Sequence, residues 1–272
     1  MEQGKDRSLV SKVMDGLVSG IVEEKYGAIL PPQDVLSKEF DVSRTVMREA
    51  LSMLLARDML DVRPKVGTRI RPMRDWRMID EDVVNWRFRA KPDPQFMRDV
   101  IEFRMLIEPR AAAQAAARAS VSEVAAIREA FEVFKTLAPG DAGYQAADEM
   151  LHTRIVHASG NQFFQQMAAI IRGALTATHP MLSQKPGAWE ISVRTHERLV
   201  EAIERRDPKE AEAAALAVID FAADEISREF SVEMPSRREQ RSNRMKDRRH
   251  VATVFAFGEN NVPMISPCAH LS

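Results

Sequence analysis

Cysteine and long apolar runs are nearly absent from this chain of 272 residues, which has a single cysteine, Cys268. A lone cysteine can form neither an internal disulfide nor a thiolate metal cluster. No stretch of eighteen apolar residues occurs and the first residues show no signal-peptide pattern, so neither a membrane span nor export is expected. These absences predict a cytoplasmic protein that makes no contact with a membrane.

Net charge is also nearly absent from the chain as a whole, at −1, but the charges are unevenly distributed. Residues 44–74 contain eight lysines and arginines against three acidic residues, a net charge of +5. Residues 75–234 contain 19 basic and 26 acidic residues, a net charge of −7. Because DNA attracts clustered positive charge, the first segment suits contact with nucleic acid and the second does not. The length leaves room for two domains.

Residues 27–70 combine two short helical patterns with a basic hairpin. The first pattern opens at Leu30-Pro31-Pro32, where prolines suit the first turn of a helix. After a break at Asp41-Val42, the hydroxyl of Ser43 is placed to cap a second helix from about Arg44 to Arg57. The buried face of that helix repeats every four residues, at Val46, Ala50 and Leu54.

The exposed face of the second helix presents Arg44, Thr45 and Arg48, and two arginines one turn apart repel each other. An anionic partner would offset that repulsion, and arginine can bond guanine or clamp phosphate. The segment Leu60 to Arg71 reads as a small hairpin whose tip contains Lys65 and Gly67. A solvated basic face on a helix pair is the alternative interpretation.

The combined pattern resembles the winged-helix head of GntR-type bacterial transcription regulators. The resemblance rests on three segments, Gly27 with Leu30-Pro31, Val42 to Leu51, and Gly67-Thr68. It implies that Ser43, Arg44, Thr45 and Arg48 meet the major groove of DNA, and that Lys65 and Gly67 reach the minor groove. Gln33 stands where the family pattern has an acidic residue, so the family's sequence preference transfers less readily.

After a boundary near residues 72–76, the chain reads as consecutive helices. A short helix around Val83 to Phe88 precedes a long alanine-rich helix over about 95–119, and four more helices follow Ser120. The expected fold is mostly α, a winged helix-turn-helix with a small β-hairpin wing followed by an antiparallel all-α bundle. The expected divisions are a DNA-binding domain (6–74), a linker and short helix (75–94), an effector-binding bundle (95–233) and a basic, disordered tail (234–272).

Asp148 and His152 are four residues apart on one predicted helix, so their side chains share a face. If the helix carrying His196 packs against that face, the three residues form an oxygen-nitrogen-nitrogen set suited to zinc, nickel, manganese or iron. The alternative is a surface pair or a capped turn. His157 and His179 have no partner at ligand spacing and are expected to serve packing or solubility.

Arg104 lies on the long helix among apolar residues and alanine, before Pro109, which is expected to bend the helix. A buried guanidinium needs a partner, because an unpaired buried charge is costly. Glu102, Glu108 or Asp148 could supply it internally. A ligand carboxylate is the other candidate, since the planar guanidinium matches two oxygens.

These residues resemble the C-terminal effector domain of the FadR branch of the GntR family. The resemblance rests on residues 104–112, 159–161 and 196–207 and on Asp148 with His152, and it covers about residues 10–232. It implies a metal held by one Asp and three His beside a small carboxylate effector, with Arg104, Asp148, His152 and His196 as effector-binding residues. Val218 stands at the fourth ligand position, so water or effector completes the coordination, or metal binds poorly.

Residues 80–86 and the missing fourth histidine are most similar to the sugar-acid regulators of this branch, which implies an aldonate or related acid as effector. The expected function is a repressor of a sugar-acid catabolic operon that binds a palindromic operator as a homodimer. A metal-dependent helical-bundle enzyme is the alternative, although no HExxH pattern or phosphate-binding glycine loop occurs. Residues 235–250 contain seven basic and two acidic residues, which could add nonspecific DNA affinity.

Overall fold

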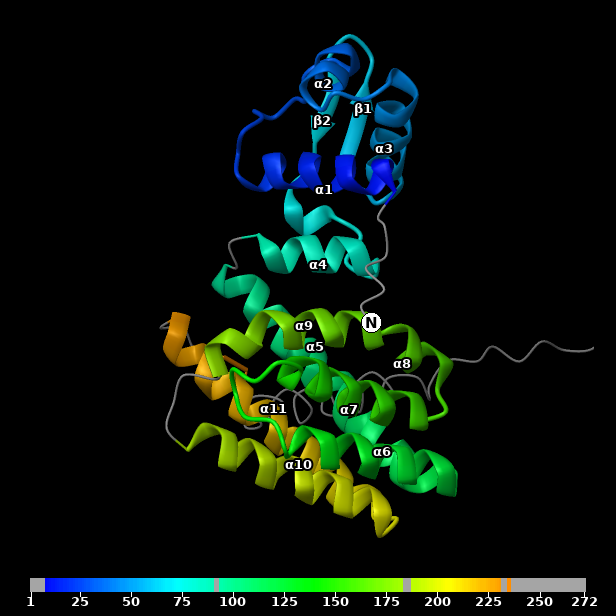
Figure 1. Ribbon diagram of the computed structural model, residues 1–272, viewed down its shortest axis with the longest axis vertical. Coiled ribbons are helices and arrows are strands. Elements are labelled where there is room, and N and C mark those ends of the chain that lie inside the picture. The colour runs from blue at the N-terminus through cyan, green and yellow to red at the C-terminus, as the bar shows by residue number, and fades with distance from the viewer. Residues whose placement is uncertain (1–7, 91–92, 183–186, 231–233, 236–272) are drawn as a thin grey trace, which may run out of the picture.

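A computed structural model of the chain describes residues 8–90, 93–182, 187–230 and 234–235. Figure 1 shows an N-terminal head at the top, the single helix α4 (Glu81–Arg89) beneath it, and a bundle of helices at the bottom. The tail expected over residues 234–272 lies outside the described residues except for 234–235. Among the described residues, no helix is long and apolar enough to cross a membrane.

The head contains the predicted helix-turn-helix and hairpin. Its elements are α1 (Leu9–Val22), α2 (Gln33–Glu39), α3 (Arg44–Ala56), β1 (Leu60–Arg63) and β2 (Gly67–Ile70). Ser43 caps α3 by accepting a hydrogen bond from the amide of Val46 at 3.3 Å, as its position predicts. The two strands pair antiparallel, with Leu60 opposite Ile70. Lys65 and Gly67 in the tight connection have φ of 63° and 106°, and the second value favours glycine.

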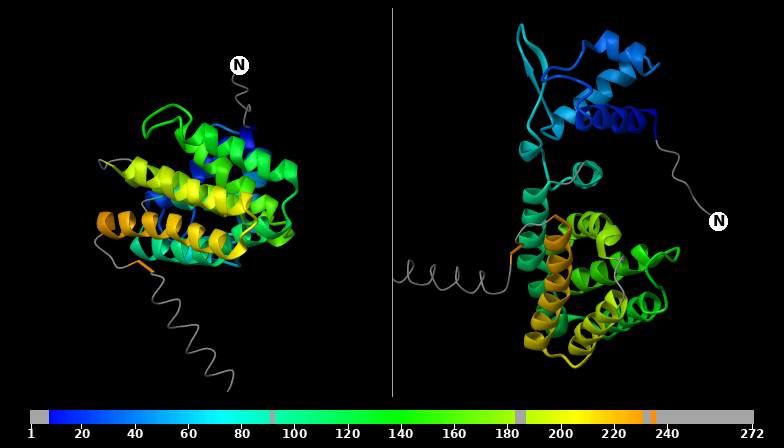
Figure 2. Two further views of the ribbon diagram at one scale, coloured as in Figure 1. Left: turned by 90° about the horizontal axis from the view of Figure 1, so that it is seen from below. Right: turned by 90° about the vertical axis from the view of Figure 1, so that its left-hand side faces the viewer.

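Helix α4 packs into both halves of the molecule, and Figure 2 shows it lying between them. Val83 and Trp86 belong to the apolar core of the head, whereas Val84 and Phe88 belong to a core of the bundle. Arg57, at the end of α3, donates hydrogen bonds to two carboxylates at the start of α4, those of Asp80 (3.2 Å) and Asp82 (2.9 Å). The segment expected to act as a linker is therefore a packed connection.

The bundle begins with α5 (Pro94–Arg118), which continues as one helix through Pro109. The helices that follow it are α6 (Val121–Phe134), α7 (Tyr144–Ala158), α8 (Gln162–Gln166), α9 (Ala168–Leu182), α10 (Ala188–Glu204) and α11 (Pro208–Phe230). The prediction of four helices after Ser120 was wrong, because the described residues form six. Asn161 caps the five-residue α8, and the break around Gly187 separates two helices.

Alanines let α5 and α11 approach closely, and Figure 1 shows the two helices side by side. The shared core of the bundle includes fully buried alanines on both helices, Ala112, Ala115 and Ala116 on α5 and Ala211 and Ala214 on α11. Small side chains reduce the spacing between helix axes. The same core includes the aromatic rings of Phe131 and Phe134 on α6.

Candidate metal centre and DNA-binding surface

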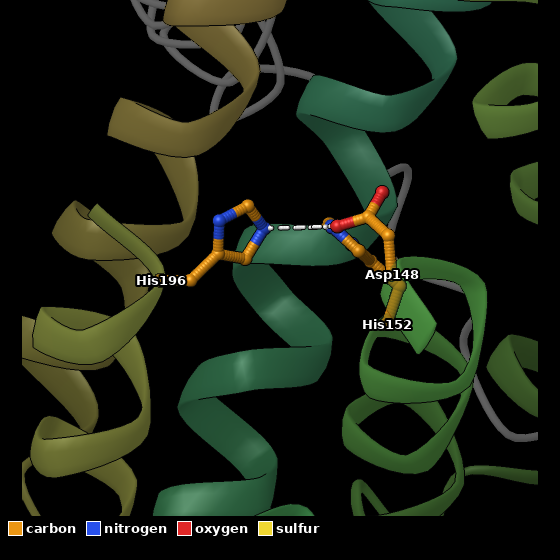
Figure 3. A group of neighbouring side chains, drawn as sticks. All are labelled: Asp148, His152 and His196. Atoms are coloured by element: carbon orange, nitrogen blue, oxygen red, sulfur yellow. Dashed lines mark hydrogen bonds and ion pairs between the residues drawn. The ribbon is translucent and has the colours of Figure 1, made fainter. Parts of the chain in front are cut away.

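The three predicted metal ligands meet inside the bundle. Helix α7 supplies Asp148 and His152, and α10 supplies His196 from the facing side (Figure 3). His152 Nε2 lies 3.1 Å from His196 Nε2, and Asp148 Oδ1 lies 3.8 Å and 3.5 Å from these two nitrogens. All three residues are buried, and their potential ligand atoms lie within 4.8 Å of one another. The residues therefore fit a divalent metal in donor type and convergence.

The ring of His196 is oriented by contacts on both its edge and its face. Nδ1 lies 2.8 Å from the carbonyl oxygen of Ser192, one helical turn earlier, so it is the nitrogen that donates. The ring also packs against Phe134, with centroids 4.9 Å apart. Donation from Nδ1 leaves the lone pair of Nε2 directed at Asp148 and His152.

The pKa of His196 is lowered to about 4, mainly by burial; the charge of Asp148 opposes this shift and the neighbouring His152 adds to it. His196 is therefore neutral near pH 7, which is the form that can bind a metal. The pKa of His152 shifts in the other direction. Burial alone would lower its pKa, but the carboxylates of Glu108 and Asp148 raise it.

Arg104 is buried on α5, with 1% of its side chain exposed. Of the three internal partners considered from the sequence, its guanidinium bonds Glu108, with Nε donating to Oε1 at 2.6 Å. The other oxygen of Glu108, Oε2, lies 2.7 Å from His152 Nδ1. Burial would raise the pKa of Glu108, but Arg104 and His152 outweigh it and lower the pKa to about 2. Arg104 Nη1 is buried and has no hydrogen-bond partner among the described residues.

A small cavity, partly open to solvent, lies beside these residues. Arg104 and the three candidate ligands line it, together with Tyr144, Ser192 and Val218. Val218 of α11 thus borders the cavity with a side chain that cannot bind metal. Sequence reasoning missed Tyr144 and Ser192, although helical spacing could have found them. Tyr144 precedes Asp148 by four residues, as Ser192 precedes His196.

Tyr144 remains protonated at physiological pH. Burial raises the pKa of its phenol to about 12, and the nearby carboxylate of Asp148 adds to the shift. The cavity therefore presents a neutral hydroxyl next to the charged guanidinium of Arg104. Such a lining suits a small ligand that carries both a carboxylate and hydroxyl groups.

The predicted DNA-contacting residues lie on the outside of the head. Ser43, Arg44, Thr45 and Arg48 are exposed at the start of α3, and Lys65 and Gly67 are exposed on the hairpin. Arg44 donates to Asp34 at 3.0 Å, and Gln33 donates to the carbonyl of Arg44 at 2.8 Å. The residue that departs from the family pattern thus holds the first turn of α3. Arg48 forms no hydrogen bond or ion pair with the described residues.

Two family models match the chain and together cover more than half of it. One is described as bacterial regulatory proteins of the gntR family and matches residues 9–70. The other is the FCD domain, which matches residues 99–221. The chain belongs to the GntR family. GntR regulators bind DNA operators, and FCD domains bind small-molecule effectors.

Curated relatives agree with the family. The galactonate operon transcriptional repressor of Escherichia coli K12 is 29% identical over 202 residues, 73% of this chain and 88% of the repressor. The putative L-lactate dehydrogenase operon regulatory protein of the same strain is 28% identical over 79% of this chain and 85% of its own. The matched domains and relatives are those of transcription regulators, so this GntR-family protein is not an enzyme.

A solved structure has the same fold. It is that of Lar, described as controlling the expression of the Listeria monocytogenes agr system. Lar is 16% identical to this GntR-family chain, covers 83% of it and 99% of its own length, and gives a TM-score of 0.58. At that identity the likeness concerns the fold alone.

Proposed function

We propose that this GntR-family regulator represses a sugar-acid catabolic operon by binding a palindromic operator as a homodimer, and that a small carboxylate such as an aldonate releases it. The observation that carries the proposal is Arg104, which is buried beside the cavity and has an unpartnered Nη1. An unpaired buried donor on a charged group is costly. A carboxylate entering the cavity would accept from it.

The proposed effector combines two kinds of group. Its carboxylate meets Arg104, and a neighbouring hydroxyl binds a divalent metal such as zinc, nickel or manganese, held by Asp148, His152 and His196. The metal would supply a fixed positive charge that polarises the bound oxygens. Val218 leaves one ligand position to water or to the effector. A relative named for a galactonate operon supports a sugar acid over other carboxylates.

The proposed DNA contacts belong to the domain over residues 6–74. Arg44, Thr45 and Arg48 enter the major groove from α3, Ser43 orders the first turn of α3, and Lys65 and Gly67 approach the minor groove. One head reads few base pairs, so useful specificity requires two heads on two half-sites. The domain over residues 95–233 binds the effector, and residues 75–94 join the two.

A continuous set of contacts supports communication between the two domains. Leu175 of α9 lines the cavity, and its neighbour Ala174 shares an apolar core with Val84 and Phe88 of α4. Helix α4 in turn bonds Arg57 at the end of α3. An effector that favours one arrangement of α9 and α4 would thereby change the population of heads able to bind DNA.

The test is a mobility-shift assay on DNA from the promoter of the protein's own operon, with D-galactonate as the probe. We expect wild-type protein to shift the DNA and D-galactonate to release it, with a stronger response when Zn²⁺ or Ni²⁺ is present. Arg104→Ala should abolish the response and leave DNA binding intact. Arg110→Ala is the matched control, because Arg110 lies on the same helix, half exposed and paired with Glu212. Unchanged release by Arg104→Ala would overturn the role of Arg104.

A further inference from the structure

We infer that Glu108 is a positioning residue that holds His152 as a metal ligand and Arg104 as a carboxylate anchor at the same time. The inference rests on the proposed function of the bundle and goes beyond it, because Glu108 itself touches neither metal nor effector. Its two carboxylate oxygens are divided between the two partners, Oε1 at 2.6 Å from Arg104 Nε and Oε2 at 2.7 Å from His152 Nδ1.

The contact with His152 decides which ring nitrogen can bind a metal. A carboxylate only accepts hydrogen bonds, so Nδ1 of His152 must carry the proton. In the neutral, metal-binding form of His152, Nε2 is then the lone-pair nitrogen, and it lies close to His196 Nε2 and Asp148 Oδ1. Hydrogen bonds to the distal nitrogen fix ligating histidines in this way and raise their basicity.

The two histidines of the centre are oriented by different means. His196 donates to the backbone carbonyl of Ser192, within its own helix. His152 depends on a side chain of another helix, because Glu108 lies on α5 and His152 on α7. Mutation can therefore remove the orientation of His152 without touching any candidate ligand.

Glu108 also holds Arg104, the proposed anchor for the carboxylate of the effector, in place. Glu108 engages Nε and leaves Nη1 of the guanidinium unpartnered in the buried site beside the cavity. Glu108 follows Arg104 by four residues on the same helix, and both are buried. The carboxylate of Glu108 thus sets the distance between Arg104, which would bind the carboxylate of the effector, and His152, which would bind the metal. The same effector molecule would contact both Arg104 and the metal.

Glutamine at position 108 would preserve shape but not this arrangement. If its amide oxygen accepts from Arg104, its NH₂ group faces Nδ1 and forces the proton of His152 onto Nε2, where it blocks metal binding. If the oxygen accepts from His152 instead, the NH₂ group faces the Nε–H of Arg104, and two donors oppose each other. Either orientation damages one of the two functions.

The test measures Zn²⁺ affinity of the full-length protein by competition with a chromophoric chelator. We expect Glu108→Gln to weaken Zn²⁺ binding about 10- to 100-fold, the usual cost of losing such an outer contact. Glu108→Asp keeps a carboxylate and should recover part of the affinity. Glu102→Gln is the matched control on an exposed position of the same helix and should leave the affinity unchanged.

A second measurement reports the orientation itself. In ¹⁵N spectra of histidine-labelled, metal-free protein recorded at a pH at which His152 is neutral, His152 should be protonated at Nδ1 in the wild type and shift toward Nε2 in Glu108→Gln. A merely structural role for Glu108 would not change this signature in a variant whose circular dichroism is normal. If the amide oxygen in Glu108→Gln accepts from His152 instead, Zn²⁺ affinity persists, and D-galactonate binding without metal should weaken because Arg104 loses its acceptor.

The outcomes separate this inference from the function on which it rests. Equal Zn²⁺ affinity, an unchanged His152 spectrum and unchanged D-galactonate binding in Glu108→Gln would overturn the positioning role while leaving the metal centre in place. A wild-type protein that binds no Zn²⁺ would overturn the metal centre, and the role of Glu108 toward the metal with it. If Glu108→Gln fails to fold, the comparison of Glu108→Asp with the wild type decides, and equal affinities there would contradict the inference.

Discussion

The interior of the head and the interior of the bundle differ in the polarity of the side chains that they bury. Among the described residues before α4, the only buried polar side chain is Ser37, and the core is otherwise apolar. The bundle instead buries five ionisable groups together, Arg104, Glu108, Asp148, His152 and His196. Buried charges contribute little net stability even when paired. The head therefore keeps its function on the outside of a stable core, whereas the bundle gives up apolar interior to hold a functional site.

The largest effect is expected from a substitution on the exposed surface of the head. Arg48→Ala should reduce operator affinity by about 1–3 kcal/mol for each head in the proposed dimer, because a bidentate contact to a base is lost. Exposure of Arg48 means that stability should not change. Fluorescence anisotropy with labelled promoter DNA measures the affinity, and D-galactonate binding should match the wild type. Loss of both activities would point to misfolding and would contradict a purely external role.

Substitutions that create a cavity in the core of the head or in the core of the bundle should affect different activities. Leu54 in the head and Leu151 in the bundle are both fully buried, and truncating either to alanine should cost about 2–5 kcal/mol of unfolding free energy. We expect Leu54→Ala to lose DNA binding but keep thermal stabilisation by Zn²⁺, and Leu151→Ala to show the reverse. Urea denaturation, anisotropy and thermal shift measure the three quantities. If each variant loses both activities, the two cores unfold as one unit.

The junction between the regions can be tested at Gly173 of α9. A Cβ there would lie 2.7 Å from Val84 Cγ1 and 3.1 Å from ring atoms of Phe88, so Gly173→Ala must displace these side chains of α4 or α4 itself. Such overpacking costs about 1–3 kcal/mol. We expect DNA affinity to persist and release by D-galactonate to weaken, as measured by anisotropy. Thr176→Ala, on an exposed position of α9, serves as the control, and an unchanged response in Gly173→Ala would exclude this route.

The smallest effect is expected from removing a helix cap, which can be done in the head and in the bundle. Ser43 caps α3 of the head, and Ser120 caps α6 of the bundle in a reciprocal arrangement with Glu123. Alanine at either position should cost about 1 kcal/mol of unfolding free energy, as measured by urea denaturation. Only Ser43→Ala should also weaken DNA binding, because α3 carries the proposed contacts. Equal losses of DNA affinity would mean that the caps act through global stability alone.

Local patterns predicted the head and part of the bundle correctly. Ser43, the four-residue apolar repeat and the glycine near the hairpin tip act over a few residues, so the sequence determines the helix-turn-helix directly. The spacing of Asp148 and His152 placed them on one face, and the structure brings His196 to them. Whether a metal binds stays a prediction.

Features that depend on packing between helices were not accessible from the sequence. Three carboxylates lay within plausible reach of Arg104, and the i,i+4 spacing on α5 already favours Glu108; only the placement of α5 against α7 brings His152 to the second oxygen of Glu108. Helix α4 has apolar residues on two sides, which gave no indication that one side faces the head and the other the bundle. The separation of α9 from α10 is different, because the helix-breaking pair Pro186-Gly187 stands in the sequence and could have predicted it.

The alanines shared by α5 and α11 have a consequence for which molecules the cavity admits. Arg104 and Val218 line that cavity from these two helices, so the spacing between the helix axes sets its width. A larger side chain in place of Ala115 or Ala214 would push the axes apart, because interaxial distance follows the size of the contacting side chains. Residues that do not line the cavity thus set the size of the ligand that it admits. A single added methyl group at one of these alanines could widen the cavity for a bulkier acid.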